Sequence, residues 1–238
     1  MQYRTELHAH TREASRCADF SCFDVADKYI EAGFTTLVLT NHYFHGKLKK
    51  QIEESGRVWV EHYIDTWRRM RDYAAGRLNI LLGCEIRFSE NMNDYLVFGL
   101  TEDFLRAHPD LHLMDHKSFS AFARENGLLF IQAHPFREKM TVVDPKYLDG
   151  FEVFNAHAKH DARNYLANEE ALRFGLIRTS GGDFHHPDHV PGDGGILTDF
   201  PITSMEQLVE TLKDGNYTLA CRGRAAARDR MSDMPAKL

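Results

Sequence analysis

The chain has 238 residues, of which 43% are hydrophobic and 27% are charged, and its formal net charge is −6 with the histidines neutral. This balance is typical of a soluble chain with a buried core and excludes a disordered or fibrous protein. Lysine and arginine are dispersed along the chain, so no basic patch is expected and duplex nucleic acid is not an expected partner. We expect one domain over residues 1–238, because α/β barrels reach this length undivided.

The cysteines and the start of the chain indicate a reducing, aqueous compartment. Cys17, Cys22, Cys84 and Cys221 are widely spaced and form no C-x-x-C pair, which favours reduced thiols over a disulfide framework or a structural zinc site. The first residues lack the apolar run of a secretory signal, and no stretch approaches the ~18 apolar residues of a membrane span. A cytoplasmic protein without membrane contact is therefore expected, and no pattern in the sequence predicts its oligomeric state.

Short apolar runs alternate with longer amphipathic segments, which predicts repeated βα units and a largely parallel sheet. The expected strands span residues 3–7, 35–40, 78–83, 95–100, 128–133, 150–155 and 176–180. The expected helices span residues 23–32, 58–75, 117–126, 162–174 and 204–214, where apolar residues recur at spacings of three and four. Gly33, Gly127, Gly175 and Gly215 each follow a predicted helix, as a left-handed helix stop requires.

Ligand-type side chains follow five of the predicted strands. In chain order they are His8 and His10, then His42, Glu85, His134, and finally Asp183 with His185. In a parallel α/β barrel, residues just beyond the carboxyl ends of the strands share the mouth where active sites lie. Imidazole and carboxylate together suit zinc, iron or manganese, and such ions generate a hydroxide near neutral pH at open sites. The pattern therefore predicts a metal-dependent hydrolase that holds two or three divalent ions.

Five segments resemble the motifs of the PHP (polymerase and histidinol phosphatase) family of phosphoesterases. They are, in the family's order, Glu6-Leu7-His8-Ala9-His10-Thr11, Thr40-Asn41-His42, Gly83-Cys84-Glu85, Ala133-His134-Pro135 and Gly181-Gly182-Asp183-Phe184-His185. The resemblance implies a distorted TIM-like (β/α)7 barrel with up to three ions. It also implies one ion at His8, His10, Glu85 and Asp183, a second at His42 and His185, and a third at Glu85 with His134.

Three residues depart from the family's pattern. Glu6 stands where Asp is common, Asn41 replaces the usual Asp before His42, and Gly182 replaces the usual Ser before Asp183. None of the three is expected to bind an ion directly. We therefore expect them to alter the hydrogen bonds that orient the ligands rather than metal binding itself.

Two ligand positions stay open in the sequence. Where the family often has Asp or His after Ser15, this chain has Cys17, with Asp19 close behind. Cys17 is either a thiolate ligand or a small apolar residue. Asp94, before the predicted strand 95–100, either replaces a histidine of the third site or belongs to a turn.

Three further residues are candidates for substrate binding. Arg137, three residues after His134, either binds phosphate through its guanidinium fork or forms a surface salt bridge. Asn155 and His157 follow the predicted strand 150–155 on the same rim and contact either the substrate or a metal ligand. No residue is identified as the general acid.

Hydrolysis of a small phosphate monoester by a metal-activated water is the function that these patterns favour. Glycine-rich phosphate loops of the types G-x-G-x-x-G and G-x-x-x-x-G-K-[ST] are lacking, so nucleotide-driven phosphoryl transfer has no support. Three alternatives remain open. They are a phosphodiesterase or exonuclease on nucleotides or short oligonucleotides, a hydrolase of a non-phosphate bond, and a non-catalytic metal-binding module.

Overall fold

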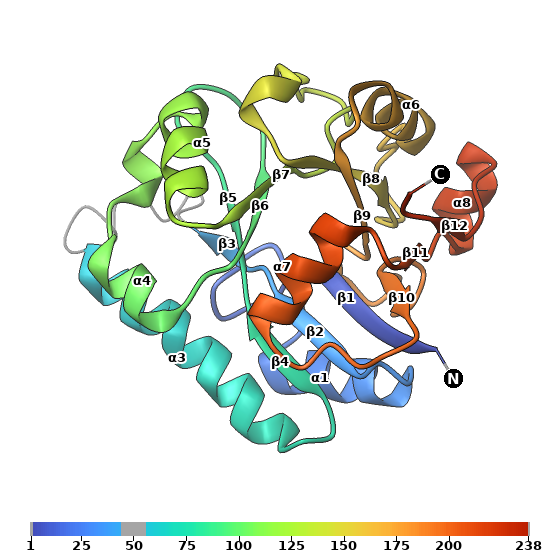
Figure 1. The fold of residues 1–238 in the computed structure, drawn as a ribbon. Helices are drawn as coiled ribbons and strands as arrows, with labels where there is room; N and C mark the ends of the chain where they lie inside the picture. The colour runs from blue at the N-terminus through green and yellow to red at the C-terminus, as the bar shows by residue number, and fades with distance from the viewer. Residues whose placement is uncertain (1, 44–55, 238) are drawn as a thin grey trace.

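The strands pair into two mixed six-stranded sheets, with helices around them (Figure 1). The structure is a computed structural model that describes residues 2–43 and 56–237. One sheet has the order β12-β11-β10-β1-β2-β4 and the other β3-β5-β6-β7-β8-β9. The strands are β1 (Tyr3–Ala9), β2 (Thr36–Leu39), β3 (His42–Tyr43), β4 (Asn79–Leu82), β5 (Cys84–Ile86), β6 (Tyr95–Phe98), β7 (Leu129–Gln132), β8 (Gly150–Asn155), β9 (Ile177–Gly181), β10 (Ile196–Thr198), β11 (Thr218–Leu219) and β12 (Met234–Pro235).

The helices that the sequence predicts are present with small shifts at their ends. They are α1 (Cys22–Glu31), α3 (Gly56–Ala74), α5 (His116–Glu125), α6 (Asn164–Phe174) and α7 (Met205–Asp214). Gly175 and Gly215 end α6 and α7 with φ of 65° and 70°, the left-handed conformation expected of a helix stop. The short helices α4 (Glu102–Ala107) and α8 (Gly223–Asp229) were not predicted, because six or seven residues are too few to establish a helical period. In the described part of the chain, no helix has both the length and the apolarity to cross a membrane.

The chain passes directly from one sheet into the other at two places, between β2 and β3 and between β4 and β5. At the second crossing a Cβ on Gly83 would lie 2.6 Å from Cγ1 of Val38, so only glycine fits. The Tyr63 hydroxyl of α3 lies within hydrogen-bonding distance of both crossings, 3.0 Å from the Asn41 carbonyl and 2.8 Å from the Gly83 carbonyl. Helix α3 thereby fixes the two points beyond which β3 and β5 begin.

The prediction of a largely parallel sheet is wrong, because β6 runs antiparallel to both β5 and β7. The connection between β5 and β6 spans only residues 87–94. A parallel crossover needs a dozen residues or more, so this loop turns the chain back. Strands β10, β11 and β12 are also antiparallel to their neighbours. The pairings among the described residues do not show closure into the (β/α)7 barrel that the family resemblance implies.

Candidate metal centre

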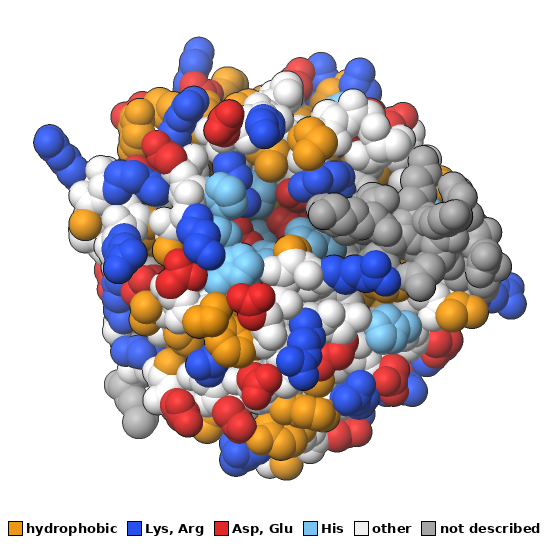
Figure 2. Space-filling view, turned by 180° about the vertical axis from the view of Figure 1, so that it is seen from behind, with side chains coloured by type: hydrophobic (Ala, Val, Ile, Leu, Met, Phe, Trp, Pro, Cys, Tyr) orange, Lys and Arg blue, Asp and Glu red, His pale blue; other side chains and the backbone are white. Residues whose placement is uncertain are grey.

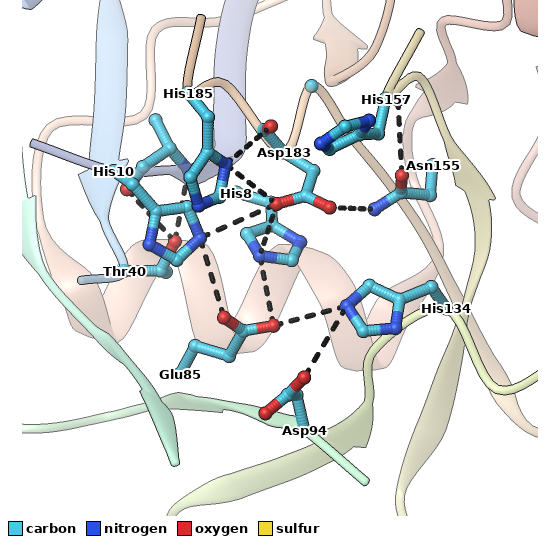
Figure 3. A network of polar contacts seen from close by, with 12 residues as sticks. His8, His10, Thr40, Glu85, Asp94, His134, Asn155, His157, Asp183 and His185 are labelled. Carbon is cyan, nitrogen blue, oxygen red and sulfur yellow. Dashed lines mark hydrogen bonds and ion pairs between the residues drawn. The ribbon is translucent and has the colours of Figure 1, made fainter. Parts of the chain in front are cut away.

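The structure brings the predicted ligands together at one end of the strands. All of them are buried: His8, His10, His42, Glu85, His134, Asp183 and His185. Figure 3 shows most of these side chains pointing toward a common centre, and in Figure 2 histidines surround a hollow with acidic side chains inside it. An isolated bridge between Ala9 and Phe184 holds the segment after β9 beside β1. Asp183 and His185 of that segment therefore lie close to His8 and His10.

Glu85 lies at the middle of the cluster. Its Oε1 is 3.2 Å from His8 Nε2 and 3.3 Å from His134 Nε2. Its Oε2 is 2.8 Å from His42 Nδ1 and 3.4 Å from His10 Nε2. One carboxylate thus faces four imidazoles from three strands, β1, β3 and β7, which is the position expected of a bridging ligand.

Asp183 provides the second carboxylate. Its Oδ1 lies 3.5 Å from His8 Nε2, 3.6 Å from His10 Nε2 and 3.2 Å from His185 Nδ1. Its Oδ2 points away from these rings, toward Arg137 at 2.5 Å and Asn155 at 3.2 Å. Oδ1 is therefore the oxygen available to an ion, and Oδ2 is occupied by protein donors.

Hydrogen bonds fix which ring nitrogen of His10 carries the proton. Asn41 Oδ1 accepts from the Thr11 amide at 2.7 Å and from the Ser15 hydroxyl at 2.9 Å. Ser15 Oγ has then donated its only proton and must accept from His10 Nδ1, which lies 3.0 Å away. His10 Nε2 consequently presents a lone pair to the cluster. Asn41, one of the departures from the family's pattern, is part of this orienting chain.

His8 is oriented in the same way by a residue that the sequence did not single out. Glu152, in the middle of β8, lies 2.8 Å through Oε1 from His8 Nδ1. Its Oε2 accepts from the His134 amide at 3.0 Å and from Asn155 Nδ2 at 2.9 Å. The lone carboxylate in the otherwise apolar run of β8 was the signal that could have identified it, because a buried acid needs partners.

The side chains of the cluster offer the ligand atoms that divalent ions bind, and two ring nitrogens among them lack another partner in the described part of the chain. His8 Nε2 and His10 Nε2 are buried, have no hydrogen-bond partner among the described residues, and face carboxylate oxygens. Such unpaired acceptors are costly unless a cation lies between them. Four overlapping groups have ligand atoms within 4.8 Å of one another: His10, His42 and His185; His8, His10 and Glu85; His8, His134 and Asp183; and His42, Glu85 and Asp94.

The charges of the cluster shift its protonation equilibria. Burial raises the pKa of Glu85, but His8 and His42 outweigh burial and hold that pKa well below its ordinary value. Burial likewise opposes protonation of His42 and His185. The Glu85 charge raises the pKa of His42 to about 10, and hydrogen bonding with Asp183 raises the pKa of His185 to about 9. In the absence of ions, protons on these imidazoles balance the two carboxylates.

Two candidate ligands have unusual backbone conformations. His134 has a φ of 32° and Asp183 a φ of 47°, in the left-handed region that side chains other than glycine rarely adopt. Conformations of this kind cost on the order of 1–3 kcal/mol each and cluster at functional sites. At the ends of β7 and β9 the fold therefore holds His134 and Asp183 in backbone conformations that these residues would not adopt by themselves.

Arg137 is not a surface residue. Its Nη2 donates to Asp183 Oδ2 at 2.5 Å and to Asn155 Oδ1 at 3.0 Å, and its side chain is 14% exposed. The guanidinium therefore contacts the centre from the side of the cavity. Asn155 is fully buried behind Asp183, whereas His157 lines the cavity beside Arg137.

The residues at the open ligand positions have different surroundings. Asp94 lies at the site because β6 is antiparallel, which brings the start of that strand to the ligand end. Its oxygens accept from Arg87 at 2.7 and 2.6 Å, and Oδ2 is 4.0 Å from His134 Nε2. Asp19 is directed elsewhere and lies 2.9 Å from His186 Nδ1.

Cys17 borders the cluster. Its thiol makes hydrogen bonds with the rings of His185 and His42. Partial desolvation opposes ionisation of this exposed thiol, but the hydrogen bonds and charges of the two rings outweigh it and lower the pKa of Cys17 to about 6. The site therefore has a sulfur atom beside its imidazoles.

A cavity of about 330 Å³ opens over the cluster, a size within the range of small-molecule sites. Ligand candidates form its floor, and its walls combine charged and apolar side chains. The wall residues are Arg87, Met92, Arg137, Glu138, Lys139, Met140, His157, His160 and His186.

No family model matches the sequence, and no curated protein matches it. Solved structures are similar in fold. A two-domain protein of Bacteroides vulgatus that contains a predicted PHP-like metal-dependent phosphoesterase aligns over 93% of this chain with a TM-score of 0.65 and 16% identity. The chain has a PHP-like fold. The resemblance that the sequence motifs indicated is thus confirmed at the level of the fold.

Two other structures extend the comparison. Endonuclease Q, in complex with a duplex that has an abasic lesion at the active site, aligns over 91% of this chain with a TM-score of 0.61 and 12% identity. An amidohydrolase of Chromobacterium violaceum, with bound sulfate and no metal, aligns over 88% of this chain and 96% of its own, with a TM-score of 0.53 and 17% identity. This chain spans 65% of the Bacteroides protein and 58% of endonuclease Q. It combines a PHP-like fold with buried His, Glu and Asp clusters that resemble a polynuclear metal site.

Proposed function

We propose that the chain hydrolyses small phosphate monoesters with two or three divalent ions at this centre, zinc, manganese or iron. The observation that carries the proposal is the pair of buried Nε2 atoms on His8 and His10, which face Glu85 and Asp183 and have no hydrogen-bond partner among the described residues. When bound, divalent ions neutralise phosphate charge and lower the pKa of a coordinated water.

The protein's own part is to orient the phosphate above the floor of the cavity. Arg137 reaches the floor beside Asp183 and provides N–H donors for a phosphate oxygen. His157 Nδ1 accepts from the Lys159 amide at 3.2 Å, so the proton of the neutral ring is on Nε2. Burial lowers the pKa of His157 to about 2 despite the nearby Asp183 charge. His157 therefore serves as a neutral hydrogen-bond donor to the substrate.

Phosphodiester cleavage is the second candidate, because the fold is similar to that of endonuclease Q. A monoester is favoured by the cavity of about 330 Å³, which suits a small molecule. The net charge of −6 also disfavours a long polyanion as the substrate. A small phosphorylated molecule rather than duplex nucleic acid is accordingly the proposed partner.

The test is phosphate release from a panel of monoesters, diesters and nucleotides by protein loaded separately with zinc, manganese and iron. An Asp183→Ala variant is the control, since it removes Oδ1 from the centre. Turnover of monoesters by the wild type and not by the variant supports the proposal. A preference for diesters would instead support phosphodiester cleavage. No turnover of either ester by protein shown to contain ions would refute both functions.

A further inference from the structure

Cys17 is the one of the four cysteines that lines the cavity over the cluster. It is exposed, whereas Cys22, Cys84 and Cys221 are buried. Its thiol makes hydrogen bonds with His42 and His185. A thiol that merely fills space in a loop needs no imidazole partner, and this one has two.

The backbone on both sides of Cys17 is fastened to the centre. The Ala18 amide donates to the Ser15 carbonyl at 2.8 Å, and the Asp19 amide donates to the His185 carbonyl at 2.9 Å. Ser15 Oγ in turn accepts from the His42 amide at 2.9 Å. The loop is thus attached to both segments that provide these histidines, and the Cys17 thiol makes hydrogen bonds with both rings.

A third imidazole lies beside the two that contact Cys17. His10, His42 and His185 have ligand atoms within 4.8 Å of one another. His10 is 0% exposed, and its Nε2 has no hydrogen-bond partner among the described residues. This unpaired nitrogen is evidence for a ligand that does not depend on the cysteine.

We infer that Cys17 is a thiolate ligand of the ion held by His10, His42 and His185. The inference rests on the proposed metal centre and adds a chemical preference to it. Three imidazoles and one thiolate form a tetrahedral site of the kind that zinc and cobalt occupy. Soft sulfur disfavours magnesium and manganese, which prefer oxygen. The other ligands, with Glu85 and Asp183 among them, form a harder environment, so the centre has two chemically different positions.

The decisive experiment uses the full chain loaded with cobalt(II), whose spectrum reports a cobalt–thiolate bond directly. We expect a thiolate-to-cobalt charge-transfer band in the wild type and in a Cys221→Ala control. The band should be absent in Cys17→Ser and in Cys17→Asp, although the visible ligand-field bands of Cys17→Asp show that cobalt still binds. A wild-type protein that binds cobalt without the charge-transfer band would overturn the assignment, as would an unchanged band in Cys17→Ser.

Thiol labelling provides a second measurement that needs no variant to fold. Because only Cys17 is exposed, the metal-free folded protein should react at one thiol with a disulfide reagent. Zinc should slow that reaction by about tenfold or more and magnesium should not, as expected if zinc holds the thiolate at ~2.3 Å. Equal rates with and without zinc would refute the inference. Neither measurement involves hydrolysis, so failure of the proposed function and failure of this inference are distinguishable.

Discussion

Glu6 and Gly182 are complementary in shape. The Gly182 amide donates to Glu6 Oε1 at 2.8 Å, and a Cβ on Gly182 would lie 2.8 Å from Glu6 Oε2. The same Oε1 accepts from the His8 amide at 2.9 Å, and Oε2 accepts from the Tyr29 hydroxyl at 2.9 Å. The longer side chain at position 6 therefore occupies the space that a serine at position 182 would need. Two separate departures from the family's motifs are thus in direct contact.

The first prediction follows from this fit. Gly182→Ser should destabilise the protein by about 1–3 kcal/mol through overpacking. Combining it with Glu6→Asp should recover part of that loss, because the shorter acid withdraws from the new side chain. Denaturant unfolding of the two single variants and the double variant measures the coupling. Effects that add to within about 0.5 kcal/mol would show that the two positions are independent.

The second prediction concerns Glu152. In Glu152→Gln the amide oxygen can replace Oε1 toward His8, but its NH2 group then faces the N–H donors of His134 and Asn155. We expect zinc affinity to fall about 10–100-fold, the usual effect of losing a carboxylate that orients a ligand. Competition with a chelator measures the affinity. Glu169→Gln, at an exposed position of α6, is the matched control, and an equal loss there would contradict the assignment.

The third prediction is a pH dependence of the metal-free protein. His185 and His42 have folded pKa values raised to about 9 and about 10. Their contribution to stability is therefore fully present below the ordinary histidine value of about 6.5 and is lost as the pH rises through those folded values. Cys17 acts in the opposite direction, but only below the ordinary thiol value of about 8.5. The melting temperature of chelated protein should fall above that pH, less steeply in His42→Gln. Equal slopes would contradict the prediction.

The fourth prediction separates two roles of Arg137. The guanidinium already neutralises Asp183 Oδ2, so Arg137→Met should leave zinc content unchanged. Removing its donors from the cavity should weaken phosphate monoester binding, seen as a KM raised by about tenfold or more, because a hydrogen bond to a charged group contributes about 1.5–3 kcal/mol. Arg137→Lys should recover part of the effect. Arg173→Met on the exposed face of α6 is the control, and loss of zinc from Arg137→Met would instead indicate a role in maintaining Asp183.

The strand ends that carry the metal-ligand candidates could be predicted from the sequence, because each apolar run stops where a residue with a ligand side chain follows. Apolar runs end abruptly at His42, Glu85 and His134, and that change is local information. The direction of β6 was not accessible in the same way, since a run of four buried residues reads identically in either direction. The position of Asp94 at the site depends on that direction and was therefore left open.

Partner residues that only the folded arrangement of the strands brings together were also beyond prediction. Arg87 and Asp94 form an ion pair whose geometry requires the short turn between β5 and β6. Glu152 and His8 meet only because β8 and β1 end in the same cluster. The sequence identified which residues have ligand chemistry, whereas the residues that orient them were determined by strand order.

The ligands are distributed so widely along the chain that the centre is completed late in synthesis. His8 lies in β1 and His10 just after it, whereas His185 follows β9. The antiparallel partner of β1 is β10. At about 5–20 residues per second, a ribosome needs roughly 10–35 s to proceed from the first histidines to the last one. During that interval one edge of β1 is unpaired, and His8 and His10 lack the Asp183 carboxylate. The proposed centre is therefore complete only when the segment after β9 has been made, and until then the unpaired edge of β1 is open to pairing with other chains.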